Sequence, residues 1–201
     1  KEYLGKHQRI IFNGDGYSPD WVREAARRGL PNIKSMVEAA STLTTEKAVK
    51  LFEKIGIFTR IELESHEEII YEKYAKTINI EANTMIDMAG KKYIPAVMKY
   101  TKSLADTVIA VREAGGDASV QAELLREVSG YLAAARAAMV KLSEVIARAG
   151  AMSEAREQAF FYKDTVMDAM ARLRAPIDEL EKIVDKEIWP VPGYGELTFE
   201  V

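Results

Sequence analysis

Apolar residues recur three and four positions apart over most of the chain beyond residue 59. The register is clearest between residues 121 and 149, where the spacing has no fault. Its members are Leu125, Val128, Leu132, Ala135, Met139, Leu142, Ile146 and Ala149. Such a repeat is typical of a helix that packs lengthwise against other helices. Residues 97–111 and 166–184 repeat it, so the pattern predicts an antiparallel, up-down-up bundle of three helices joined by short turns.

The first helix of this bundle is predicted to be very long and interrupted. Thr59 followed three residues later by Glu62 is a capping box, which marks a helix start. The helical pattern then runs to about Glu113, before a pair of glycines. Pro95 lies inside it, and because the proline ring removes one backbone hydrogen bond we expect a kink near residues 90–92.

The N-terminal part shows a different pattern. Residues 8–12 indicate a short strand, closed by a turn at residues 13–17. Residues 18–29 predict a helix with a serine N-cap and a terminal glycine, and residues 30–37 are either a second short strand or an irregular connection. Residues 45–55 predict an amphipathic helix. Its inward positions are expected to be Ala48, Val49, Leu51, Phe52 and Ile55.

The predicted fold is therefore mainly α, with a long kinked helix, an antiparallel three-helix bundle and a small α/β N-terminal piece. We expect three parts: residues 1–58, which continue from an upstream domain, the bundle at 59–188, and a docked tail at 189–201. Two prolines end the last helix, and the apolar alternation of the tail predicts an edge strand. The alternating residues are Leu197, Phe199 and Val201.

Glu81 lies inside the apolar arc of the long helix when each residue advances by about 100°. An unpaired buried carboxylate is costly, so a cation meets it, or it is protonated, or the face belongs to an interface. We expect a basic side chain from another helix or from an upstream part to reach Glu81. The candidate structural or interface residues are Glu81, Asn79, Asp87, Trp189 and Tyr194.

The composition excludes several classes of protein. A net charge of -3 offers no basic field for nucleic acid, and the arginines at 23, 27 and 28 are interpreted as a solvated helix face. The chain has no cysteine, hence no disulfide frame or thiolate site. No apolar run approaches the ~20 residues that span a bilayer. The chain begins with Lys1 rather than Met, so we expect it to be a piece of a longer protein.

The chemical motifs are weak. The Gly14-Asp-Gly16 turn resembles the start of a dinucleotide fingerprint, but Pro19 takes the third glycine position. His7 and His66 are the only histidines, too few for a di-iron site, and the pair Glu62 and His66 lacks a third zinc ligand. We therefore predict no catalytic, cofactor-binding or metal-binding residue in this chain.

Several separate strings nevertheless resemble one family, in the same order along nearly the whole chain. They are Ile10-Ile-Phe-Asn-Gly-Asp-Gly-Tyr-Ser18 with Trp21, Arg28-Gly-Leu-Pro-Asn32, Tyr74-x-x-Thr-Ile-Asn-Ile-Glu-Ala82 with Met85 and Met88-Ala89, Ile94-Pro-Ala96, and Trp189-Pro-x-Pro-x-Tyr194. Together they resemble the C-terminal part of a type III glutamine synthetase. The helix at 121–149 carries no such string and is predicted from periodicity alone.

The resemblance implies a cytoplasmic ligase of nitrogen metabolism that uses ATP and divalent metal, Mg or Mn, to join ammonia to glutamate in a dodecamer. The catalytic motifs of that family lie upstream, so none maps onto this chain. We expect a structural, oligomerisation or regulatory domain that is inactive alone and whose partners are the upstream catalytic domain and further copies of the parent. The competing hypothesis is a stand-alone helical interaction module, and a sensor pocket near Pro95 is a third.

Overall fold

The computed structural model describes residues 2–199, with residues 194, 195 and 199 described in their backbone only. The chain divides into two compact units, Lys1–Glu67 and Glu68–Val201, which we call unit 1 and unit 2. The domain limits proposed from the sequence, at residues 58 and 188, stay predictions.

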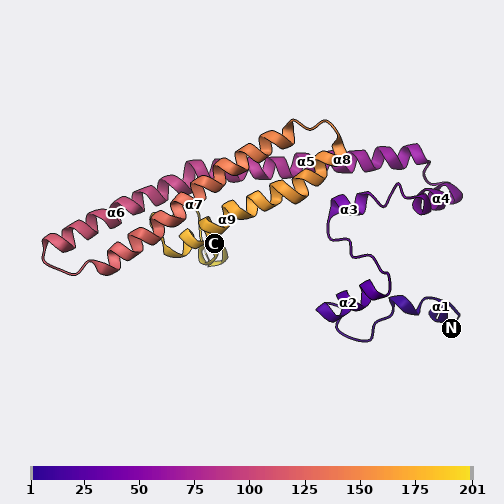
Figure 1. Cartoon of the computed structure of the whole chain (residues 1–201), viewed down its shortest axis with the longest axis horizontal. Helices are drawn as coiled ribbons and strands as arrows, with labels where there is room; N and C mark the ends of the chain where they lie inside the picture. The colour runs from indigo at the N-terminus through magenta and orange to yellow at the C-terminus, as the bar shows by residue number, and fades with distance from the viewer. Residues whose placement is uncertain (1, 200–201) are drawn as a thin grey trace. The chain divides into compact units, whose positions relative to one another are not determined.

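Unit 2 is an antiparallel bundle of long helices, as predicted (Figure 1). Helix α7 returns along α6, and α9 lies along α7. The elements are α5 (Arg60–Met88), of which residues 60–67 belong to unit 1, the π-helical turn η2 (Ala89–Tyr93), α6 (Ile94–Glu113), α7 (Ser119–Gly150), α8 (Ala155–Phe161), a second π-helical turn η3 (Tyr162–Val166) and α9 (Met167–Ile183).

The predicted heptad seam of α7 forms the centre of this bundle. Val128, Ala135, Leu142 and Ala149 are each 0% exposed, and the other members of the seam are half-buried. Their side chains join buried residues of α5, α6 and α9 in one hydrophobic core. Because every heptad contributes to the same core, the bundle buries apolar surface along its whole length.

The capping box and the interruption predicted for the long helix are both present. Thr59 and Glu62 form the capping box: the Thr59 backbone N–H donates to Glu62 Oε2 at 2.7 Å, and the Glu62 N–H donates to Thr59 Oγ1 at 3.3 Å. The predicted break before Pro95 is the π-helical turn η2, in which the N–H of Ile94 donates to the carbonyl of Ala89. A wider turn of this kind accommodates Pro95, which has no backbone N–H to donate.

Unit 1 contains short helices, and the predicted strand at residues 8–12 is wrong. Residues 8–10 form a 3₁₀ turn instead, in which the Ile11 N–H donates to the carbonyl of Gln8. Within residues 2–199 no second strand exists to pair with this segment, so local bonds satisfy its backbone. The elements are α1 (Glu2–Lys6), η1 (Gln8–Ile10), α2 (Pro19–Arg27), α3 (Met36–Ala40) and α4 (Glu46–Ile55).

The predicted edge strand of the tail is also wrong, because residues Tyr194–Phe199 form helix α10. The Glu196 carboxylate caps the start of this helix by accepting the Gly193 N–H at 2.7 Å, and Lys186 pairs with the same carboxylate at 3.0 Å. Val201 lies outside the described residues. The local cap therefore outweighs the alternation of apolar residues.

Candidate functional site

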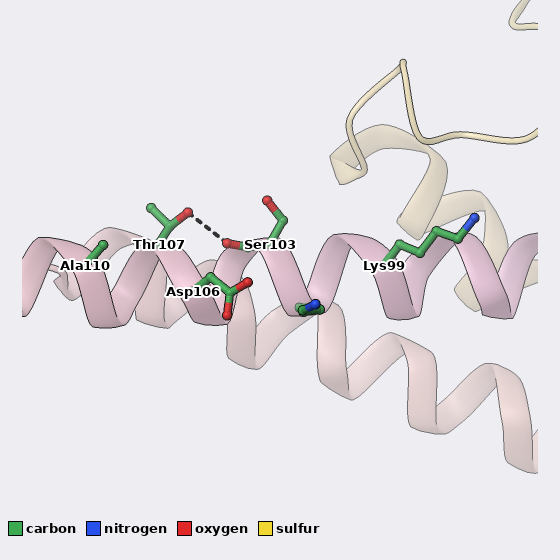
Figure 2. Close-up of a pocket in the computed structure, with 6 residues that line it drawn as sticks. Lys99, Ser103, Asp106, Thr107 and Ala110 are labelled. Carbon is green, nitrogen blue, oxygen red and sulfur yellow. Dashed lines mark hydrogen bonds between the residues drawn. The ribbon is translucent and has the colours of Figure 1, made fainter.

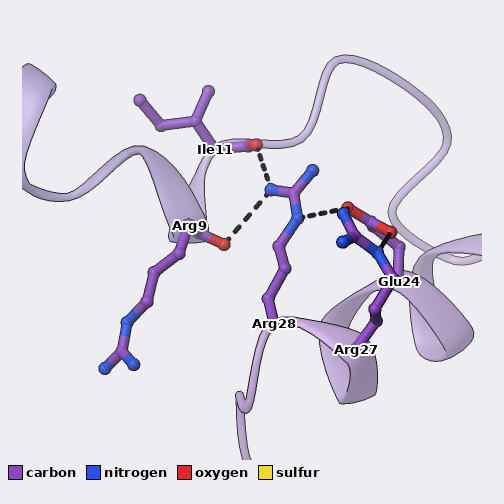
Figure 3. A network of polar contacts seen from close by, with 5 residues as sticks. All are labelled: Arg9, Ile11, Glu24, Arg27 and Arg28. Carbon is purple, nitrogen blue, oxygen red and sulfur yellow. Dashed lines mark hydrogen bonds and ion pairs between the residues drawn. The ribbon is translucent and has the colours of Figure 1, made fainter.

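Arg28 is the centre of a network of polar contacts in unit 1 (Figure 3). Its Nη1 donates to the carbonyl of Ile11 at 2.7 Å and to that of Arg9 at 3.2 Å. Its Nε donates to Glu24 Oε1 at 2.5 Å, and Arg27 donates to both oxygens of the same carboxylate, at 2.6 and 2.7 Å. We call these five residues the Arg28 network; it fastens the loop before α2 to the end of that helix.

The local sequence places Arg28 where it can do this. Ser18 caps α2 by accepting the Trp21 N–H at 3.3 Å, and Pro19 fits the first helical position. Gly29 ends the helix in the left-handed region, with φ of 68°, which costs glycine little. The helix is therefore held at both ends by its own residues, and Arg28 projects from its last turn.

Aromatic rings complete the same motif. The Phe12 and Trp21 rings stack with centroids 4.6 Å apart, and the Arg28 guanidinium lies 5.6 Å from the Trp21 ring centroid. A Cβ at Gly14 would lie 2.8 Å from Cε1 of Phe12, so a larger residue here would displace the stacked Phe12 ring. The loop, the aromatic stack and the arginine thus form one preorganised unit.

The hydrogen bonds from Arg27, followed by those from Arg28, lower the pKa of Glu24 to about 2. A carboxyl whose folded pKa lies below its unfolded value of 4.5 contributes stability above that value and loses it as the pH falls. We expect the Arg28 network to open as the pH falls from about 5 to 2. NMR titration of the amides of residues 9–28 measures this, and a Glu24 midpoint near 4.5 would contradict it. Glu24→Gln should remove the transition.

Two surface hollows flank the Arg28 network. One has a volume of about 450 Å³, and its lining residues are mainly of apolar type, with Trp21, Val22 and Leu30 among them. The other, of about 500 Å³, is basic and is lined by residues that include Arg9 and Arg27. An apolar hollow beside a basic one is suited to contact with another protein surface rather than to enclosing a small molecule.

No residue between 2 and 36 is buried. Large apolar side chains lie exposed in this segment, including Ile10 at 62% and Tyr17 at 100%. In α4, Leu51 and Ile55 are also exposed, although the sequence predicts that they face inward. Unit 1, taken by itself, therefore presents several large exposed apolar side chains.

Glu81 is exposed, so the prediction of a core-facing carboxylate is wrong. The buried residues of α5 around Glu81 follow a narrow seam through Ala75, Ile78 and Ala82. Placing successive residues at 100° steps predicts an apolar arc that is wider than this seam. This wider arc wrongly includes Glu81. An exposed carboxylate needs no cation, and a role for Glu81 in an interface with an upstream part stays a prediction.

Asn79 and Asp87 lie on the same helix but have different surroundings. Asn79 is half-buried, and its Oδ1 accepts hydrogen bonds from Tyr162 Oη and Asn83 Nδ2, each at 3.1 Å. Asp87 is exposed and pairs with Lys91 one turn later. Asn79 thus fastens α5 to the second π-helical turn, whereas Asp87 makes a surface ion pair of little energetic weight.

Replacing Tyr162 with Phe should lower the free energy of unfolding by about 1 kcal/mol, because the buried ring stays and one hydrogen bond is lost. Tyr162 is 3% exposed, and burial raises its pKa. Urea unfolding followed by circular dichroism measures the change. The Asn79→Ala variant and the double variant complete a mutant cycle; strictly additive losses would show that the bond contributes nothing.

The aromatic candidates lie in the tail. Trp189 is half-buried and stacks on Tyr93 of η2, with ring centroids 5.1 Å apart. It packs against the core of the bundle together with Ile188. The side chain of Tyr194 lies outside the described residues. Trp189 therefore fastens the end of α9 to the π-helical turn before Pro95.

Unit 2 carries a hollow of about 480 Å³ on α6 (Figure 2). Its lining includes Lys99, Ser103 and Asp106, all from one face of a single helix, and the Thr107 hydroxyl is bonded to the Ser103 carbonyl at 2.8 Å. Side chains from one helix cannot surround a ligand, so this hollow is a feature of the surface rather than a binding site.

The described residues contain neither a cluster of metal ligands nor a helix suited to spanning a membrane. No group of three His, Asp or Glu side chains lies close enough to hold a metal ion. None of the described helices is both long and apolar enough to cross a bilayer. The predicted pair Glu62 and His66 has other contacts: Glu62 bonds Thr59, and the His66 ring lies 5.0 Å from that of Phe58.

Sequence reasoning missed Arg28 as a site residue. Arg23 and Arg27 are about three-quarters exposed, as expected for a solvated face, but the Arg28 side chain is only 22% exposed. The available signal was its spacing: Arg28 follows Glu24 by one helical turn and directly precedes the terminal glycine. Its bonds to Arg9 and Ile11 cross 19 and 17 residues and leave no trace in a local pattern.

Comparison with known proteins identifies the relatives of this chain. The family model described as the glutamine synthetase C-terminal domain matches residues 1–112. A glutamine synthetase of Butyrivibrio fibrisolvens is 35% identical over 203 residues, which cover 100% of this chain and 29% of that protein. A type-3 glutamine synthetase of Dictyostelium discoideum is 35% identical, and a glutamine synthetase of Bacteroides fragilis is 32% identical; each covers 99% of this chain and 28% of the relative.

The chain thus spans less than a third of the length of these curated relatives. The family model ends near the end of α6, whereas the relatives also align with α7, α8 and α9. The helix at residues 121–149, which carries no recognised string, is therefore part of the same relationship. The chain belongs to the family of glutamine synthetase C-terminal domains.

Proposed function

We propose that this chain serves as the structural C-terminal domain of a glutamine synthetase and contributes contacts, not catalytic groups, to the parent. The parent would use ATP and a divalent metal, Mg or Mn, to ligate ammonia to glutamate. We assign no step of that reaction to this chain.

The observation that supports a structural role is the contrast between the two units. Unit 2 has a continuous hydrophobic core, and the packing of this core stabilises the unit by itself. Residues 2–36 bury no side chain, yet they are shaped by helix caps, an aromatic stack and the Arg28 network. A segment with defined local structure and no core requires a partner surface to offset its conformational entropy.

The same family supports further proposals about the parent. The upstream catalytic domain of the same polypeptide is the expected partner of this chain, and the parent is expected to be a cytoplasmic homo-oligomer, a dodecamer. A stand-alone interaction module is less well supported, because the relatives extend far beyond the matched region. Of the methionines that motivated that hypothesis, only Met98 is exposed; Met85 and Met88 are half-buried.

A γ-glutamyl transfer assay tests the proposal. The 201-residue chain should give no turnover with ATP and Mg or Mn, whereas the full-length parent assayed beside it should be active. The parent without residues 1–201 of this chain should lose activity and assembly, as judged by light scattering. Turnover by the isolated chain would overturn the proposal.

A further inference from the structure

We infer that the apolar hollow of unit 1, lined by Trp21, Val22 and Leu30, is the surface by which this domain docks on the catalytic part of its own polypeptide. This inference rests on the proposed function and adds the residues that make the contact. The hollow has a volume of about 450 Å³ and also includes Gly16, Ala25 and Asn32.

The first argument is that this surface is apolar and open. Val22 is 47% exposed and lies on α2, beside the exposed residues of the preceding loop. A monomeric protein rarely exposes several large apolar residues on one short segment unless they meet another surface. Residues 2–36 bury no side chain and expose several large apolar ones. A partner that covers this surface would bury these apolar side chains.

The second argument is that the surface is preorganised. Arg28 bonds two carbonyls of the loop and lies against the ring of Trp21, which lines the hollow, so the position of this ring is supported before a partner binds. Rigid aromatic residues lose little conformational entropy on binding, which makes them effective anchors. A segment that stayed in contact with solvent alone would have no use for a binding surface ordered by the Arg28 network.

The third argument concerns the occupant. In the relatives, more than two thirds of the polypeptide lies outside the matched region, and this tethered part is present at high effective concentration. Five of the residues that line the hollow lie in the strings that resemble the family: Gly16, Trp21, Leu30, Pro31 and Asn32. These observations favour the rest of the same polypeptide over an unrelated protein.

The charges beside the hollow define the chemistry of the contact. Arg9 and Arg27 line the basic hollow, and Figure 3 shows the Arg9 guanidinium directed away from the Arg28 network. A fitting partner segment therefore presents an apolar side chain to Trp21 and Val22, with Asp or Glu nearby to pair with the arginines.

The test uses the full-length parent with Val22→Asp and a matched control, Ile109→Asp. Both residues are about half-exposed in this chain, at 47% and 55%, but Ile109 lies on α6, far along the sequence from the hollow. In the parent, Val22→Asp should increase amide hydrogen exchange across residues 2–36 by at least about tenfold, and Ile109→Asp should not. Arg9→Glu should give a smaller increase that fades at high salt.

The outcomes separate the inference from the proposed function. Equal exchange in Val22→Asp and wild-type parent would overturn the docking surface, while an inactive isolated chain would still support the structural role. A change in subunit number with unchanged exchange in residues 2–36 would also overturn it, since the hollow would then meet a second copy. Unchanged circular dichroism of Val22→Asp in the 201-residue chain shows that α2 itself tolerates the substitution.

Discussion

Replacing Leu142 with Ala should lower the free energy of unfolding of the bundle by about 2–5 kcal/mol. Leu142 is 0% exposed and belongs to the seam of α7, which packs against both α6 and α9. The substitution removes buried apolar atoms and leaves a cavity that long packed helices cannot easily close. Urea unfolding of the 201-residue chain, followed at 222 nm, measures the loss.

Val140 provides the matched control for this prediction. It lies on the same helix two residues earlier and is 42% exposed. Val140→Ala should change the free energy of unfolding by less than about 0.5 kcal/mol, as is usual for surface positions. Equal losses in the two variants would show that the seam does not carry the stability of the bundle.

Replacing Arg28 with Ala should release the loop before α2. The substitution removes the bonds to the Ile11 and Arg9 carbonyls, the contact with Glu24 and the cover over Trp21. Hydrogen bonds that involve a charged group contribute about 1.5–3 kcal/mol each when well buried, and less at a partly exposed site such as this. We expect amide exchange in residues 9–28 to accelerate by about tenfold or more.

Arg28→Lys is the informative control, because lysine keeps the charge but lacks the planar fork that reaches two carbonyls and a carboxylate together. It should recover only a small part of the protection. Full recovery in the lysine variant would mean that charge alone orders the loop, and the geometry described here would be irrelevant to it.

The long elements of this fold were predictable because their signals repeat. The seam from Leu125 to Ala149 repeats the same spacing of apolar residues in every heptad. The capping box that begins at Thr59 is complete within four residues. Pro95 likewise acts locally, through the donor that it lacks. Such features survive in any tertiary context, which is why the bundle and its interruption were both found where the pattern placed them.

The incorrect predictions have different physical causes, and only some of them depend on residues far away in the sequence. The segment at residues 8–12 has the composition of a strand but no neighbouring strand in the described chain, and the tail after residue 193 is helical because Glu196 caps it. Glu81 was misplaced by a few tens of degrees, which is enough to move a side chain from a core to its rim. Arg28 depends on carbonyl partners far back in the sequence, and no periodic pattern encodes them.

The central claim is that residues 2–36 obtain their stability from the remainder of the parent protein, whereas the bundle does not. Amide hydrogen exchange of the isolated 201-residue chain and of the full-length parent, compared peptide by peptide, tests it most directly. Residues 2–36 should exchange at least about tenfold more slowly in the parent, and residues 119–150 should exchange at similar rates in both. Equal rates for residues 2–36 in the two proteins would contradict the account.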